Sequence, residues 1–223
     1  MKFIALLLML GFVSPGLVSA SSITNSFDSD AEGWVANVPE GALTYSTLAG
    51  NPGGYIRLTD TGGSSVNGFA SGAFFGADFI GDLSAFDGGS LSFDLRAFAG
   101  GGPTFSSFGR VMLYRTGDAN PADQTFEAAA DIVANATASW VSYTLNFDAL
   151  TFGVTQVAWN DLLGNIAAIG IATDAFDGAD TIGIDNVALE SPTVPPAVPL
   201  PAGWILGLTA FFITAAFKRT SAS

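Results

Sequence analysis

The sequence contains neither cysteine nor histidine. Without cysteine the fold cannot be held by disulfides, so its stability must come from a hydrophobic core, with bound metal as the other available support. The two absences also exclude a Ser-His-Asp triad, a Cys-His dyad and zinc sites built from thiolate or imidazole ligands. An enzyme built from this sequence would have to rely on carboxylates.

Positive charge is also scarce, with seven lysines and arginines in 223 residues. Residues 21–190 contain four arginines, no lysine and all 20 acidic residues, which gives this stretch a formal charge of −16. Such a surface repels a phosphate backbone and anionic lipid headgroups, which argues against nucleic-acid binding. The carboxylates either keep the protein soluble or, in part, bind cations.

The first 20 residues have the pattern of a secretory signal peptide. Lys2 provides the positive start, Phe3–Val13 is an apolar run too short for a bilayer span, and small residues precede position 21. These features predict cleavage between Ala20 and Ser21. A buried N-terminal helix is the alternative interpretation.

The other end carries a second apolar segment. Residues 191–202 form a proline-rich linker, which is stiff and lacks many backbone donors. Residues 203–219 are predicted to form a transmembrane helix with a basic stop at Lys218 and Arg219. The body, residues 21–190, would then lie outside the cytoplasm.

The junction of linker and helix resembles a known bacterial sorting signal. The residues are Val198, Pro199, Leu200, Pro201, Ala202 and Gly203, followed by the apolar helix and the basic end. This order is similar to the VPLPA variant of PEP-CTERM signals. The resemblance implies recognition by an exosortase, removal or replacement of the tail, and an association with exopolysaccharide. A plain membrane anchor is the alternative.

The body shows the period-two patterning of β-strands, separated by Gly, Asn and Asp turns. The predicted strands are Gly54–Thr59, Ser90–Ala97, Gly109–Tyr114, Ser139–Phe147, Ala167–Thr173 and Thr181–Leu189. Thr61–Ala77 is rich in Gly and Ser and is predicted to be a loop. A helical turn is expected near Ala119–Ala134 or around Trp159–Leu163. The pattern favours an all-β antiparallel sandwich.

Local motifs in the body resemble laminin-B-type domains and galactose-binding-like jelly rolls. They are, in chain order, Phe27-Asp28, Gly33-Trp34, Asn51 to Tyr55, Phe79 to Ser84, Gly88 to Phe93, Trp140, Trp159 and Ile184 to Leu189. The resemblance implies a jelly-roll β-sandwich that spans nearly all of residues 25–190. Trp34 and Phe93 are expected in its core, because aromatic side chains bury a large apolar area.

The same resemblance implies a structural Ca²⁺ that joins the opening and closing strands. The matching positions are Asp28 and Asp185, with Asp30 nearby. Calcium takes six to eight oxygen ligands, which two carboxylates, backbone carbonyls and water can supply. The alternative is that Asp28 is a turn residue and Asp185 a solvent-facing strand residue.

A sugar-binding site is the other candidate in the body. Trp159, Asn160 and Asp161 combine an aromatic face with an amide and a carboxylate, and Tyr55 and Tyr114 are further candidates. The alternative is that Trp159 is a core residue.

These features together favour a non-enzymatic, exported glycan-binding or exopolysaccharide-associated protein. A structural surface protein without a specific ligand remains open. So does a carboxylate-dependent glycan hydrolase or lyase, although some suitably spaced pair is inevitable among 20 acidic residues.

Overall fold

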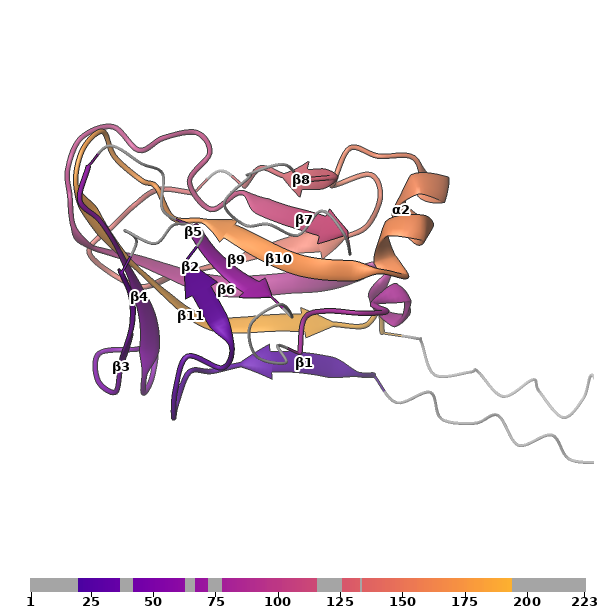
Figure 1. Cartoon of the computed structure of the whole chain (residues 1–223), viewed down its shortest axis with the longest axis horizontal. Helices are drawn as coiled ribbons and strands as arrows, with labels where there is room; N and C mark the ends of the chain where they lie inside the picture. The colour runs from indigo at the N-terminus through magenta and orange to yellow at the C-terminus, as the bar shows by residue number, and fades with distance from the viewer. Residues whose placement is uncertain are drawn as a thin grey trace, which may run out of the picture. The chain divides into compact units, whose positions relative to one another are not determined.

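The computed structural model describes residues 20–36, 42–62, 67–71, 78–115, 126–132 and 134–193, and these residues form two antiparallel β-sheets (Figure 1). The six-stranded sheet has the order β3 (Ala42–Ser46), β4 (Tyr55–Asp60), β11 (Asp180–Glu190), β6 (Gly89–Ala99) and β9 (Val141–Phe147), with β1 (Ser22–Asn25) also on β11. The five-stranded sheet has the order β2 (Trp34–Ala36), β5 (Asn67–Ser71), β10 (Ile166–Ala172), β7 (Val111–Arg115) and β8 (Ala128–Ala130).

The predicted all-β antiparallel sandwich is confirmed, and each of the six predicted strands overlaps an observed one. One expectation about an irregular segment is wrong. Residues 67–71 form β5, a strand paired with β2 and β10, although Thr61–Ala77 was expected to be a loop. A helical turn was expected at one of two places, and at the first of these Ala128–Ala130 forms the strand β8. Pairing with neighbouring strands overrides the weak strand propensity of Gly, Ala and Ser at both places.

The core lies between the two sheets and follows the alternation of each strand. Ile182 and Ile184 of β11 are fully buried, as are most apolar residues that face them from the other sheet. Trp34 and Phe93 are 3% and 1% exposed, which confirms both as core residues. The Trp34 ring meets Phe27 edge-to-face at 5.9 Å, so the opening segment is anchored in the core.

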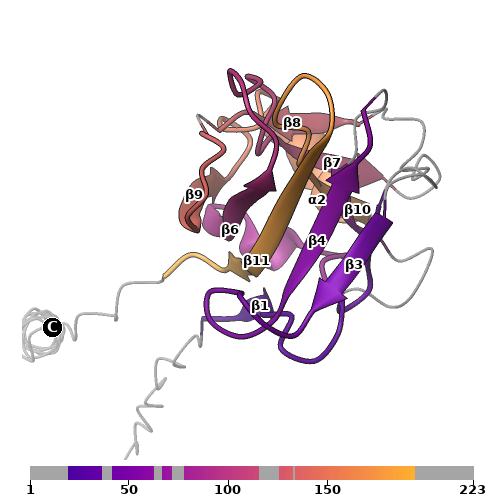
Figure 2. The same cartoon turned by 90° about the vertical axis from the view of Figure 1, so that its left-hand side faces the viewer.

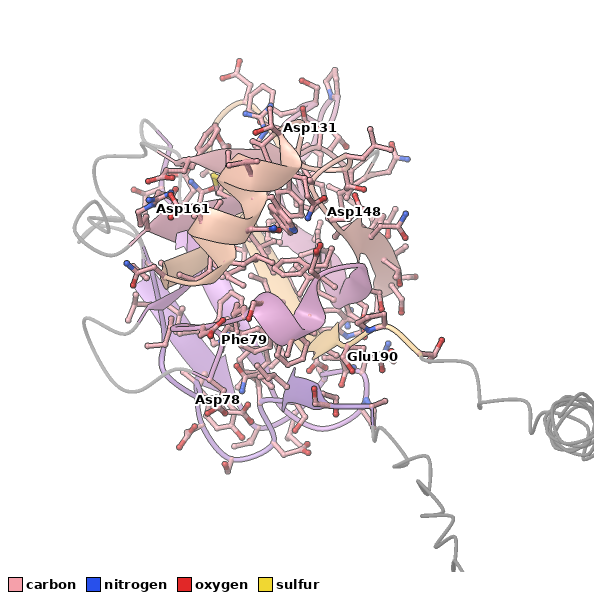
Figure 3. All side chains as sticks on the ribbon, turned by 90° about the vertical axis from the view of Figure 1, so that its right-hand side faces the viewer. Asp78, Phe79, Asp131, Asp148, Asp161 and Glu190 are labelled. Atoms are coloured by element: carbon pink, nitrogen blue, oxygen red, sulfur yellow. The ribbon has the colours of Figure 1, made fainter. Side chains whose placement is uncertain are left out.

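One short helix, α2 (Gln156–Leu163), lies at one end of the sandwich beside the 3₁₀ turn η1 (Ser84–Phe86) (Figure 3). Thr155 caps α2, because its hydroxyl accepts the Ala158 N–H at 3.2 Å. Trp159, Leu162 and Leu163 face the core at the spacing expected of one helix face. The expected helical turn at Trp159–Leu163 is therefore confirmed.

On one side, strand β11 pairs with β4 along its first half and with β1 along its second half, as Figure 2 shows from the side of the six-stranded sheet. Residues 180–184 pair with β4, and residues 187–190 pair with β1. The register with β6 shifts between Asp185 and Ala188, and Asn186 has a φ of 49°. The irregular turn at residues 49–54 contacts β11 at this bend.

The described segment closes on itself at its two ends. Ser21 donates its backbone N–H to the Ser191 hydroxyl at 2.9 Å, and Ser191 donates its own N–H to the Ser21 carbonyl at 2.9 Å. Residues 20–193 form one compact unit. Within the described residues, no helix is long and apolar enough to cross a membrane. The segment expected to do so, residues 203–219, lies outside the described residues, as do residues 1–19 of the predicted signal peptide and the residues from Val198 to Gly203.

Candidate functional site

Asp185 is the most enclosed acidic residue of the six-stranded sheet, with 0% exposure. Its Oδ2 accepts the Asn51 N–H at 2.5 Å, and its Oδ1 accepts the Asn186 N–H at 2.8 Å. The pKa of Asp185 is raised to about 6, mainly by burial and also by the negative charges of Asp94 and Asp28, although the two backbone hydrogen bonds lower it. Asp185 is therefore a buried carboxylate and not the solvent-facing strand residue of the alternative interpretation.

Asp28 packs against the turn at residues 49–54, and Asp185 packs against the same turn. A Cβ on Gly53 would collide with Asp28 Oδ1, and a Cβ on Gly50 would lie 2.8 Å from Asp185 Oδ2, so both carboxylates pack against the backbone of this turn. Asp30 has a different role, because its Oδ1 accepts the Glu32 N–H at 2.7 Å within the turn that leads to β2. The structure thus brings together two of the three predicted cation ligands.

Several backbone oxygens also line this turn. The carbonyls of Gly53 and Gly54 crowd Gly50, and the carbonyls of Phe27 and Ser46 crowd Gly54. Hard oxygen donors of this kind suit Ca²⁺. Among the described residues, however, no three acidic side chains converge closely enough to form a metal site by themselves. A cation at this turn would need carbonyl oxygens and water for most of its ligands.

The predicted sugar-binding cluster at Trp159 is corrected by the structure. Trp159 is 0% exposed, stacks on Phe152 at 5.0 Å and donates its indole N–H to Asp87 at 2.8 Å. A sugar ring cannot reach its faces. Asn160 and Asp161 are exposed, but Asp161 accepts a 2.8 Å bond from Arg115 (Figure 3). Trp159 is the core residue of the alternative interpretation.

The two further candidates, Tyr55 and Tyr114, are 5% and 1% exposed. Burial raises the pKa of Tyr114 to about 12. Neither phenol offers an open face for stacking on a sugar. Sugar binding must therefore use other residues.

A pocket of about 160 Å³ opens on the outer face of the five-stranded sheet. This face is distinct from the main core, because alternate residues of β7 and β10 form a separate small apolar cluster around Met112, Tyr114, Ala168 and Ala172. The residues that line the pocket are Asn67, Ser107, Arg110, Met112, Phe126, Ala172 and Asp174.

The pocket combines one accessible aromatic ring with polar groups of every type. Phe126 is 37% exposed. Arg110 is held by two bonds to Asp131, from Nε to Oδ1 at 2.5 Å and from Nη2 to Oδ2 at 3.2 Å. This pairing raises the pKa of Arg110, so the guanidinium stays charged. The Asn67 side-chain oxygen accepts the Thr173 N–H at 3.2 Å, which fixes that amide at the pocket wall.

Sequence reasoning missed this pocket. Its residues come from four separate segments of the chain, and no short motif unites them. Phe126 falls in the segment where a helical turn was expected. The available signal was an arginine in a body that has only four, but nothing in the sequence places Arg110 beside Phe126.

Comparison with known proteins identifies the fold and no more. No family model and no curated protein matches the sequence. The solution structure of the module CtCBM11 is 16% identical, with a TM-score of 0.50, and the match covers 81% of this chain and 100% of that chain. This similarity shows the jelly-roll sandwich of a carbohydrate-binding module.

Two further solved structures match less closely. The family 11 carbohydrate-binding module of Clostridium thermocellum, in complex with a β-1,3-1,4-mixed-linked tetrasaccharide, is 15% identical with a TM-score of 0.44, covering 81% of this chain and 93% of that chain. The CBM22-1–GH10 modules of xylanase 10B from Clostridium thermocellum, complexed with xylohexaose, are 12% identical with a TM-score of 0.46, covering 77% of this chain and 28% of that chain.

Proposed function

We propose that the protein is a non-enzymatic glycan-binding module and that its site is the pocket on the outer face of the five-stranded sheet. The observation that carries this proposal is the exposed ring of Phe126 beside Arg110, Asn67 and Asp174. A sugar ring presents C–H groups that pack on an aromatic face, and hydroxyls that accept from a guanidinium or donate to a carboxylate. The jelly-roll fold, shared with carbohydrate-binding modules, is consistent with this use.

The size of the pocket limits what it holds. Its volume is about 160 Å³. Pockets that enclose drug-sized ligands are larger, about 300–1,000 Å³. We therefore expect the pocket to hold one sugar residue of a longer chain, with neighbouring residues of the polysaccharide lying over the open sheet face.

The test is affinity electrophoresis of the full chain in gels that contain β-1,3-1,4-glucan, xylan or dextran. We expect retardation by at least one β-linked polysaccharide. Phe126→Ala should weaken that binding at least about tenfold, equivalent to about 1.4 kcal/mol. Phe105→Ala is the matched control, because Phe105 is 39% exposed and does not line the pocket. Equal losses in the two variants would contradict this site, and no retardation in any gel would contradict glycan binding and favour a structural surface protein.

A structural Ca²⁺ at the turn formed by residues 49–54 is proposed with it. The donors would be Asp28 and Asp185 with carbonyl oxygens of the turn, which suits the preference of Ca²⁺ for oxygen. The ion would offset the negative charge that raises the pKa of Asp185. Its effect would be to hold the opening segment against β11.

The route to the cell surface is also a proposal. Cleavage after Ala20 would leave Ser21 as the new N-terminus, in the position where its nitrogen meets Ser191. An exosortase-type enzyme would recognise the segment from Val198 to Gly203, and the helix at 203–219 would hold the chain in the membrane until then. Mass spectrometry of the protein from its native cells should find a chain that begins at Ser21 and lacks the basic C-terminus. An untrimmed chain would refute this route.

A further inference from the structure

Two arginines of the six-stranded sheet lie in one row on its outer face. Gly183 of β11 is paired with Arg57 of β4 on one side and with Arg96 of β6 on the other. Figure 2 shows these three strands side by side, with β11 in the middle. Adjacent strands are about 4.8 Å apart, so the two arginine backbones are separated by about 10 Å. The rings of Trp140, Phe98 and Tyr55 lie over Gly183, between them.

These two arginines are the ones without acidic partners within the described part of the chain. Arg110 is paired with Asp131, and Arg115 with Glu127 and Asp161. Among the residues that the structure describes, no such ion pair forms at Arg57 or Arg96. Two cations without an acidic partner in this part of the chain therefore lie on either side of Gly183 in a strongly acidic domain.

The neighbouring pair of acidic residues, Asp94 and Asp185, makes hydrogen bonds to other groups. Asp94 lies two residues from Arg96 on the same strand, and its Oδ2 accepts the side-chain amides of Asn51 at 3.0 Å and of Asn186 at 2.8 Å. Asp185, which is opposite Asp94, is bonded to backbone N–H groups. These contacts hold both carboxylates at the 49–54 turn and away from the arginines.

The Arg96 side chain has a buried donor without a partner. Its Nε is enclosed and has no hydrogen-bond acceptor. Leaving a buried donor unsatisfied is unfavourable, so the stem of Arg96 is held in place at some cost. The guanidinium carbon lies 4.3 Å from the centre of the Phe98 ring, which places its charge over an aromatic face.

That aromatic surface is rigid. Tyr55 stacks on Phe98 at 4.9 Å, and Trp140 meets Phe98 edge-on at 6.0 Å. Gly183 allows this arrangement, because a Cβ there would lie 2.7 Å from the Trp140 ring and 2.8 Å from the Phe98 ring. The glycine thus lets the three rings close over β11 and fixes Arg96 beside them.

We propose that this arginine row binds an anionic polysaccharide through a uronate carboxylate or a sulfate ester. A guanidinium offers paired N–H donors that match these groups, through its terminal nitrogens. Arg57, which is exposed, would close on the same anion or on its neighbour along the chain. The half-buried rings of Phe98 and Trp140 would contact the sugar carbons.

This site is on the sheet opposite to the pocket at Phe126 and does not depend on it. A protein with both sites could join two polysaccharide chains of a matrix, because each β-sheet would bind a different chain. The overall negative charge disfavours polyanions at long range. At an ionic strength of about 0.15 M this repulsion is screened beyond about 8 Å, whereas direct contacts to the arginines remain.

The experiment compares polygalacturonate, dextran sulfate and neutral dextran as probes for the full chain in a neutral detergent. Affinity electrophoresis at 0.15 M salt should show retardation by at least one polyanion and none by dextran. Polygalacturonate alone assigns a carboxylate, dextran sulfate alone assigns a sulfate, and both together assign either anion. Retardation by neither polyanion, or equal retardation by dextran, would overturn the proposal.

The variants are Arg57→Gln, Arg96→Gln and the charge-matched control Arg115→Gln. Each arginine of the row should account for at least about tenfold in affinity, the range for a charge-assisted hydrogen bond. Arg57 is exposed, so its variant should fold normally even if Arg96→Gln is destabilised. Full binding by Arg57→Gln, or the same loss in Arg115→Gln, would refute the site. Phe126→Ala should leave polyanion binding unchanged.

Discussion

The backbone N–H of Asn51 donates to Asp185 Oδ2 at 2.5 Å, across 134 residues of chain. The bond joins the 49–54 turn to β11 at the point where β11 leaves β4 and begins to pair with β1. A carboxylate is suited to this place because the bend leaves backbone N–H groups without strand partners. The same carboxylate is the main buried charge near the opening segment.

The first prediction concerns pH. Burial, with nearby negative charge, raises the pKa of both Asp185 and Asp180 to about 6, from an ordinary value of 3.8. Between pH 3.8 and about pH 6, the two carboxyl groups keep their protons in the folded protein and lose them in the unfolded chain. The free energy of unfolding therefore falls as the pH rises through this window. The protein should be more stable at pH 5 than at pH 7. About 1 kcal/mol corresponds to about 2–4 °C in melting temperature for a domain of this size.

The measurement is a series of thermal melts in calcium-free buffers of constant ionic strength. A melting temperature that rises by several degrees from pH 7 to pH 5 would support the shifted carboxyls. A flat profile, or a fall over this range, would show that the two groups titrate normally in the folded state.

The second prediction tests calcium at the turn. Millimolar Ca²⁺ should raise the melting temperature relative to a chelated sample, and more at pH 7.5 than at pH 5.5, because protons compete for the carboxylates. Asp28→Asn should abolish most of the increase. Asp30→Asn is the matched control, since Asp30 is equally exposed but bonds to Glu32. The same Ca²⁺ response in wild type and Asp28→Asn would exclude this site.

The third prediction concerns Gly183. Gly183→Ala should destabilise the domain by about 1–3 kcal/mol, the range for overpacking, because the new methyl group collides with the Trp140 and Phe98 rings. Gly101→Ala should be nearly neutral, since a Cβ at Gly101 has no atom within 4 Å. Urea unfolding of both variants measures the difference. Equal stability of the two would mean that the rings move aside without strain.

The sandwich could be predicted because its long strands carry a period-two pattern. In β6 and β11 the residues that alternate toward the core are apolar, and both strands were found at nearly their full length. Strand β5, with the sequence NGFAS, has no such pattern. It is a strand because β2 and β10 supply partners on both sides, and that information is in the topology rather than in the five residues.

The candidate site was harder to predict for the same reason. Asp28 and Asp185 were paired by their resemblance to a known fold, and the structure does bring them to one turn. Trp159 was chosen because an aromatic residue beside an amide and an acid suits a sugar. The helical spacing of Trp159, Leu162 and Leu163 instead places that ring against the core, and its polar edge faces Asp87.

The last prediction tests whether the α2 region is part of the hydrophobic core or part of a sugar-binding surface. Asp87 Oδ1 accepts the buried Trp159 indole N–H, and its Oδ2 accepts the Gln156 amide at 3.0 Å. Asp87→Ala should therefore cost about 1–3 kcal/mol of stability, because it leaves a buried donor without an acceptor. Asp161→Ala breaks only an exposed ion pair with Arg115, which solvent screens, and should leave the stability nearly unchanged. Neither variant should alter glycan affinity once the protein is folded, because both residues lie outside the pocket at Phe126. A loss of glycan binding in Asp161→Ala at unchanged stability would restore this helix as part of the binding surface.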